Sequence, residues 1–198
     1  MKDKKHIIKR ICLILLILGF IQACDLFAPR TPEPPDNQNT RFVPPTSADI
    51  VISNFINAVK DLNVENYMGC FAEDVFVFQA SSDAYSKFTS IFVQWNINSE
   101  KFYFNSLTAD NTDKLNPKVQ LSNSGFDIMT SDSAVYLSDY RITCDFIENP
   151  PRVFAGKMQL NIIKQTDGLW YIRRWNDYQN PQDTIKDTWS GLKAKYSN

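Results

Sequence analysis

The groups of this chain that could do acid–base chemistry are carboxyls and phenols, because its single histidine, His6, stands close to the N-terminus. Tyr136 and Tyr140 lie four residues apart in a run of alternating polar and apolar residues, which places both on one face of a strand. Trp175 and Asp177 end a later run of the same kind. A carboxyl with a raised pKa can act as a general base, and a phenol can donate a hydrogen bond. These four residues form the candidate small-molecule pocket, and none is assigned a catalytic role.

The same residues also have a purely structural interpretation. Both tyrosines suit an aromatic core whose hydroxyls are satisfied locally, and Asp177 suits a turn or a cap. Asp139 and Asp145 fall on the strand face opposite the tyrosines, so Asp177 is the one acid expected near the pocket. Beyond the N-terminal segment there is no histidine for a His–Asp dyad, and no Cys/His spacing typical of zinc. We therefore expect no metal site and no cofactor.

Cys70 and Cys144 are the cysteines of the region that carries these candidates. In an oxidising compartment such a pair can form a disulfide. Two buried thiols that behave as small apolar side chains explain them equally well, because Phe71 and Phe146 stand beside them. The sequence leaves both interpretations open.

Helical spacing of apolar residues dominates the first half of this region. Thr46 and Asp49 have the spacing of a capping box, ahead of apolar residues at positions 52, 55, 56, 59 and 62. The expected elements are an opening helix from Thr46, a short helix over Val64–Phe71, a strand over Val75–Phe78, a helix over Asp83–Trp95 and a further turn or two from Asn98 to Leu107.

The second half changes to strand alternation. Four strands are expected, over Lys118–Met129, Ser133–Phe146, Arg152–Gln165 and Leu169–Tyr178. One face of each is apolar and the other polar, which predicts an antiparallel meander covered by helices on one side. A last amphipathic helix over Asp183–Tyr196, with Trp189 as its anchor, is expected to pack over the sheet or over the open end of the domain that the helices and sheet enclose. The fold class is therefore α+β.

Three stretches resemble the nuclear transport factor 2-like family, also called SnoaL-like. They are Phe55–Val77, the paired runs Tyr136–Phe146 and Phe154–Ile163, and the closing run Asp167–Asp177 with its sequence DGLWYIRRWND. The resemblance implies a cone-shaped, cystatin-like α+β domain in which N-terminal helices pack on a curved antiparallel sheet. Members include isomerases, cyclases, dehydratases and many non-enzymes, which use the interior and mouth of the cone.

The N-terminus resembles an export signal. Residues 1–10 are basic, Ile11–Phe20 are apolar, and the sequence IQAC follows. The apolar run to Ala23 has 13 residues, fewer than the roughly 20 that span a bilayer. IQAC is similar to the lipobox of bacterial lipoproteins, with Ile21 at −3, Ala23 at −1 and Cys24 at +1. The resemblance implies cleavage before Cys24 and a lipid on its thiol, whereas an ordinary secretory signal is the alternative.

These assignments divide the chain into a signal peptide over 1–23, a lipidated proline-rich linker over 24–45 and a nuclear transport factor 2-like domain over 46–198. Five of the 21 basic residues and one of the 22 acidic ones fall in 1–23, so 16 and 21 remain and the net charge is near −5. A mildly acidic chain without a basic run gives no reason to expect nucleic acid as a partner.

The expected protein is a lipoprotein of the bacterial cell envelope. Cys24 would anchor it to the inner or the outer membrane, with the domain outside the cytoplasm. We expect a non-catalytic module that binds a small molecule or assembles with protein, as a homodimer through the sheet. The alternative is a small isomerase or cyclase of the SnoaL or ketosteroid-isomerase kind that acts on a hydrophobic substrate. A cone packed with aromatic side chains favours the first, and a buried acid in an apolar pocket beside a tyrosine favours the second.

Overall fold

The computed structural model describes residues 42–111, 115–147 and 152–197, which belong to one compact unit over Thr40–Asn198. The expected signal peptide, Cys24 and most of the linker lie outside the described residues. The elements in chain order are α2 (Ala48–Asp61), α3 (Val64–Met68), the 3-10 turn η2 (Glu73–Val75), β1 (Val77–Gln79), α4 (Ser82–Lys87), α5 (Thr89–Phe92), α6 (Ile97–Asp110), β2 (Lys118–Met129), β3 (Ser133–Cys144), β4 (Arg152–Lys164), β5 (Trp170–Tyr178) and α7 (Trp189–Lys195).

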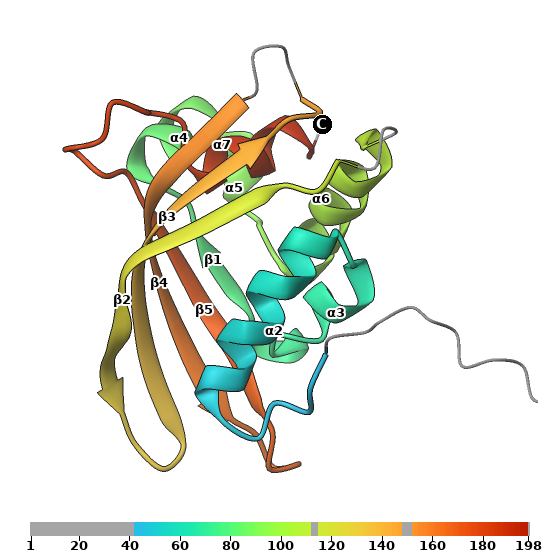
Figure 1. Ribbon diagram of the computed structural model, residues 1–198, viewed down its shortest axis with the longest axis vertical. Coiled ribbons are helices and arrows are strands. Elements are labelled where there is room, and N and C mark those ends of the chain that lie inside the picture. Colours follow the sequence, from blue (N-terminus) through green and yellow to red (C-terminus); the bar gives the residue numbers. More distant parts are fainter. Residues whose placement is uncertain (1–41, 112–114, 148–151, 198) are drawn as a thin grey trace, which may run out of the picture. The chain divides into compact units, whose positions relative to one another are not determined.

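The strands form one curved sheet in the order β1-β5-β4-β3-β2. β2 to β5 make the expected antiparallel meander, and the short β1 joins β5 in parallel at one edge. The helices pack against one side of this sheet, with α2 running across it (Figure 1). Two register shifts in β2 and one in β5, where Arg173 is the extra residue opposite Asn161 and Ile162 of β4, are bulges, which increase the bend and twist of a strand. The α+β prediction is confirmed.

Alternation along the strands decides which side chains meet the helices. In β3 every second residue from Ala134 to Cys144 is buried, and the residues between them are half-buried or exposed. β4 repeats the pattern through Phe154, Met158, Leu160 and Ile162. Together with the apolar faces of α2 and α6 these residues form a single core. The strand bounds predicted from alternation are right to within one or two residues.

The starts of the helices differ from prediction. α2 begins at Ala48 with Ser47 as N-cap, and no side-chain cap is formed, so the expected capping box at Thr46 is wrong. The Thr46 amide instead donates to Pro44 O at 2.8 Å, which is the hydrogen bond of a γ-turn just before the helix. A capping box does occur at α6, where Asn96 caps the helix together with Ser99. α6 is therefore longer than the turn or two expected from Asn98.

Two further helix predictions are corrected. The helix expected over Asp83–Trp95 is divided into α4 and α5 by Phe88, whose φ of −129° and ψ of 42° are not helical. The last helix begins at Trp189 rather than at Asp183. The preceding segment is not helical, and it is tied to the sheet by an ion pair between Asp183 and Arg141 at 3.0 Å and by Asp187 O, which accepts from the Ala155 amide at 2.8 Å.

Cys70 and Cys144 are free buried thiols, so the disulfide interpretation does not hold in this structure. Cys70 lies beside β5, since its neighbour Phe71 bridges to Ile172, and the register carries that position through β4 to Ala134 at the start of β3. Cys144 ends β3, ten residues further along and roughly 30 Å away along the strand. A disulfide needs Cα atoms within about 7 Å.

The end of the proline-rich segment is part of the folded unit. Val43 exchanges two hydrogen bonds with the Asn54 side chain of α2, at 3.0 and 2.6 Å. Pro45 is buried, and its carbonyl accepts from the Trp170 amide at 2.8 Å. Phe42 packs on the core. The last four residues of the linker expected over 24–45 therefore belong to the folded domain.

Candidate functional site

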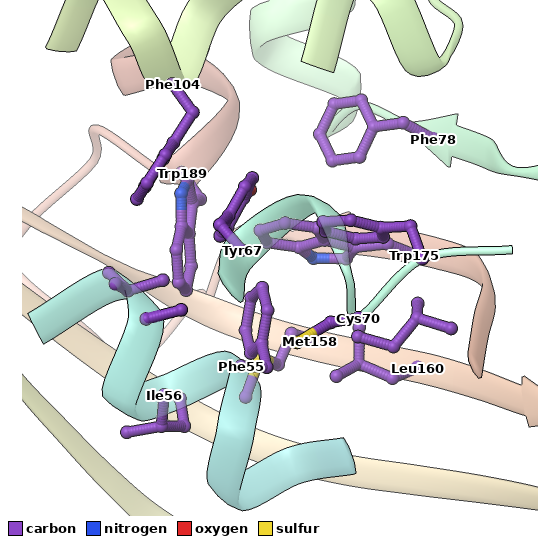
Figure 2. Close-up of a cluster of buried hydrophobic side chains, with 14 of the residues drawn as sticks. Phe55, Ile56, Tyr67, Cys70, Phe78, Phe104, Met158, Leu160, Trp175 and Trp189 are labelled. Carbon is purple, nitrogen blue, oxygen red and sulfur yellow. The ribbon is translucent and has the colours of Figure 1, made fainter. Parts of the chain in front are cut away.

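The interior between helices and sheet is filled by aromatic side chains, and α7 supplies the central one. The Trp189 ring lies 4.6 Å from that of Trp175, 5.3 Å from Tyr140 and 5.6 Å from Phe55, measured between ring centroids. Its indole nitrogen donates to the Tyr103 hydroxyl at 3.0 Å. Figure 2 shows Trp189, Trp175, Tyr67 and Phe55 gathered in this core. The space that the family resemblance offers to a ligand is thus occupied by the chain itself.

Asp177 lies in this interior at 1% exposure, as a tight cluster with the start of α7. One carboxylate oxygen accepts from the Tyr140 hydroxyl at 2.6 Å, and the other accepts from the Ser190 amide at 2.8 Å and from the Ser190 hydroxyl. The Trp189 amide donates to the Tyr140 hydroxyl at 2.7 Å. The carboxyl and the phenol therefore satisfy the first amide groups of α7, which have no partner within the helix.

Burial perturbs both groups of this pair. Loss of water raises the pKa of Asp177 above its ordinary value, against the hydrogen bonds from Ser190 and Tyr140 that stabilise its charge. The pKa of Tyr140 is well above that of a free phenol, first because it is buried and then because Asp177 is close. A raised carboxyl pKa beside a tyrosine is the chemistry of the enzyme alternative. Here each group is already bound to α7.

The structure brings together three of the four predicted site residues. Tyr140, Asp177 and Trp175 all contact the first turn of α7. Tyr136 lies on the same buried face of β3, but its ring packs on Phe126 of the edge strand β2 at 5.2 Å, and it does not join the cluster at α7. The parity argument for Asp139 is correct, since it lies on the outer face beside Lys157.

A second buried cluster was not predicted from the sequence. Glu100 of α6 and Lys193 of α7 are both 0% exposed and form an ion pair in which Lys193 Nζ contacts both carboxylate oxygens at 2.6 Å. The Tyr67 hydroxyl donates to Glu100 Oε1 at 2.5 Å, and the Trp95 indole donates to Oε2 at 2.8 Å. Burial lowers the pKa of Lys193 to about 8, although Glu100 acts to raise it.

A signal for this pair does exist in the sequence. The buried face of α6 repeats at Glu100, Tyr103, Phe104 and Leu107, and that of α7 at Trp189, Leu192, Lys193 and Tyr196. Each apolar stripe thus contains one charge, and the two charges are opposite. Charged residues are almost never fully buried unless they are paired. Two opposite charges on two apolar stripes therefore predict a contact between the helices.

The described part of the chain has several hollows, and one of about 550 Å³ includes Tyr140, Gly156 and Asp183 in its wall. A second, of about 410 Å³, is lined by residues of β2 to β5 that include Leu137, Lys157 and Tyr178. A third, of about 380 Å³, includes Val135, Asn161 and Arg174. A fourth, of about 620 Å³, lies on the helical side, where Trp95, Phe102 and Ser197 contribute to its wall.

The two buried clusters contain carboxylates, phenols, the Ser190 hydroxyl and the Lys193 amine. Within the described ranges no three His, Cys, Asp or Glu residues come close enough to hold a metal ion. Among the helices of those ranges none is long and apolar enough to cross a membrane.

Comparisons with known proteins agree on the fold. No protein-family model matches the chain, and no curated protein does. A candidate scytalone dehydratase from Novosphingobium aromaticivorans matches with a TM-score of 0.53 and 11% identity, over 71% of this chain and 89% of that one. A candidate calcium/calmodulin-dependent protein kinase II association domain from Xanthomonas campestris matches with a TM-score of 0.51 and 15% identity, over 79% and 98%.

A nuclear transport factor 2-like protein of unknown function from Pseudomonas putida is also similar, with a TM-score of 0.49 and 13% identity over 68% of this chain and 84% of that one. The element order and the matches above 0.5 show that the domain shares the α+β fold of these proteins, with helices packed on a curved antiparallel sheet. At such identities the likeness concerns the fold alone. Fold does not decide function, which has to be argued from the site.

Proposed function

We propose that this chain is a lipid-anchored protein of the bacterial cell envelope whose domain is a non-catalytic assembly module. The observation that carries the non-catalytic part is that α7 fills the cone. Trp189 and Lys193 are fully buried there, and their helix uses both Asp177 and Tyr140 as hydrogen-bond partners. The lipobox at Ile21–Cys24 supports the anchor.

Because aromatic side chains fill the interior, the surface that we propose for binding is the outer face of the sheet. Leu137 and Tyr178 are 39% and 45% exposed there, around the hollow that also contains Lys157. In the neighbouring hollow, Asn161 Oδ1 is buried and has no hydrogen-bond partner among the described residues. An unpaired buried acceptor is costly, so this part of the sheet carries an unmet hydrogen-bonding demand.

The partner that fits best is a second copy of this chain. Asp139 and Lys157 lie opposite each other in the register of β3 and β4 at 3.7 Å, so the face presents both charges together. A two-fold axis brings the same patch against itself and needs such self-complementarity.

The enzyme alternative rests on the contact between Asp177 and Tyr140 at 2.6 Å. An acid with a raised pKa beside a phenol can move a proton between carbon and oxygen of a ketone. In the closed cone the Trp189 and Ser190 amides occupy the positions where a substrate would bind. Turnover of enolisable ketones by the full chain, with loss of turnover in Asp177→Asn, would overturn the non-catalytic proposal.

Lipid attachment is tested by growing cells with an alkyne-labelled fatty acid and detecting the label on the purified protein. We expect label on the wild type and none on Cys24→Ser, because the thioether needs a thiol. Equal absence of label from both proteins would contradict the anchor and leave an ordinary secretory signal.

Assembly is tested by placing a photo-crosslinking amino acid at Leu137 in the full chain and irradiating native membranes. We expect a product of twice the chain mass. The control position is Phe102, which is 55% exposed on α6, and it should give no such product. A product with a different protein would refute the homodimer, and no product at Leu137 would refute assembly through this face.

A further inference from the structure

The groups around the Lys193 ammonium make up a complete recognition site. Its Nζ lies 2.6 Å from each oxygen of Glu100, so the counter-charge is bound through both oxygens. Tyr67 and Trp95 donate to those oxygens and fix the carboxylate in place. Such support from groups behind the first contact is what holds a binding geometry to a fraction of an ångström.

Aromatic rings surround the same ammonium. Lys193 Nζ lies 3.7 Å from the centroid of Phe78 and 3.8 Å from that of Trp175, with Trp95 and Tyr103 at 5.4 and 5.5 Å. The faces of aromatic rings attract cations, and cages of such rings are used to recognise ammonium ligands. Figure 2 shows Phe78 and Trp175 in the part of the core where this cage lies.

Every group that recognises the ammonium comes from outside α7. Phe78 belongs to β1, Trp175 to β5, and Glu100 and Tyr103 to α6. α7 contributes the ligand and none of the recognising groups. An ion pair that only holds two helices together needs a counter-charge, but it does not need four rings from separate elements arranged around one nitrogen.

We propose that the interior of the cone is a binding site for a primary ammonium group on an unbranched alkyl chain, and that Lys193 occupies it as a ligand carried by the protein itself. The site therefore takes the same class of ligand from solution once the lysine side chain is removed. This inference goes beyond the proposed assembly function and does not depend on it, because none of its residues lies on the outer face of the sheet.

The test is chemical rescue of Lys193→Ala in the full chain, purified in detergent. This substitution removes three methylenes and the ammonium, which together match n-propylammonium. We expect propylammonium chloride to raise the melting temperature of the variant by about 5 °C or more at a hundredfold excess over its Kd, relative to equal sodium chloride. Wild type should not shift, because its own side chain fills the site.

Two controls separate an ammonium site from a cavity that takes any small molecule. 1-Propanol, which has the same chain but no charge, should raise the melting temperature of Lys193→Ala far less. The double variant Lys193→Ala/Glu100→Gln keeps the cavity but lacks the carboxylate, so it should lose most of the rescue. Equal rescue by propanol, or undiminished rescue of the double variant, would overturn the proposal.

A variant that is unfolded without ligand still gives an answer. Lys193→Ala is then diluted from urea into propylammonium chloride or sodium chloride, and the folded fraction is read from the near-ultraviolet circular dichroism of the buried tryptophans. Recovery only in propylammonium supports the site, and failure to fold in both salts overturns it. Crosslinking at Leu137 is a separate readout, so failure here leaves the assembly proposal standing.

Discussion

Removing one partner of the Glu100–Lys193 pair should be among the most destabilising single changes in this domain. Lys193→Met keeps an unbranched chain of similar length in the aromatic cage but takes away the charge. Glu100 is then left at 0% exposure with only Tyr67 and Trp95 to stabilise it. Loss of one member of a buried ion pair costs about 3–5 kcal/mol, because the other charge stays buried without compensation.

The reverse change, Glu100→Gln, leaves the amine in the cage. The pKa of Lys193 is already lowered to about 8 by burial, so the side chain can release its proton when the carboxylate is gone. Releasing a proton from an ordinary lysine at pH 7 costs about 5 kcal/mol, at about 1.4 kcal/mol for each pH unit. That figure is an upper limit, so the loss of stability should approach but not exceed it.

The double variant Lys193→Met/Glu100→Gln carries neither charge. Replacement of a whole buried pair by uncharged groups is often neutral or stabilising, so we expect it within about 2 kcal/mol of wild type. The two single losses should thus exceed the double loss by a coupling energy of about 3 kcal/mol or more. Neutralising both partners together should be less harmful than neutralising either alone.

The assay is equilibrium unfolding in urea at pH 7, followed by far-ultraviolet circular dichroism and tryptophan fluorescence. Lys195→Met is the matched control, since Lys195 is exposed on the same helix and should change stability by less than about 0.5 kcal/mol. A loss below about 1 kcal/mol in Lys193→Met, or a double variant as unstable as the sum of the two singles, would refute the reasoning.

Three further predictions use other contacts. Gly156→Ala should lower the free energy of unfolding in urea by about 1–3 kcal/mol, because a Cβ there would lie 2.5 Å from a backbone oxygen. Gly125→Ala, where the added Cβ meets open space, should be tolerated. Equal effects of the two substitutions would contradict this reasoning. In a Cys12→Ser/Cys24→Ser background, Ellman's reagent at pH 8 should find no reactive thiol in the folded protein, because burial raises the pKa of both remaining thiols. After unfolding without reductant it should find two. If it finds none after unfolding, the two cysteines form a disulfide. Burial raises the pKa of Asp177 above 3.8, so the folded state holds its proton more tightly than the unfolded chain, and stability relative to Asp177→Asn should fall as pH rises from about 4 towards neutral; a rise would refute the shift.

The strands could be predicted closely because their side chains obey a period of two and their ends carry turn residues. The bounds of β2 are as expected, and Asp139 lies on the outer face as parity required. Helix ends were less predictable, since caps compete with local alternatives. Thr46 is of a residue type that often caps a helix, but its amide donates to Pro44 O instead. Asp183 is of a type that often starts a helix, but its carboxylate pairs with Arg141.

The candidate site was predicted in part. Tyr140 and Asp177 do contact each other, but both also bind the start of α7. The sequence pattern of their own strands gives no information about that helix. Lys193 and Glu100 are 93 residues apart in the chain. A charged residue on the apolar face of a helix can be recognised from the local sequence. The oppositely charged residue that stabilises it when buried comes from a tertiary contact. Reading both stripes together would have suggested the pair.

The place of α7 in the chain also bears on how the domain is made. Until α7 docks, the carboxylates of Glu100 and Asp177 have no α7 to bind and stay hydrated. Contacts between residues so far apart in sequence form late, since the entropy of closing the intervening chain has to be overcome first. A folding intermediate in which α7 has not docked should therefore hold an open, wet cavity, and the dry aromatic interior should arise in a last step of folding.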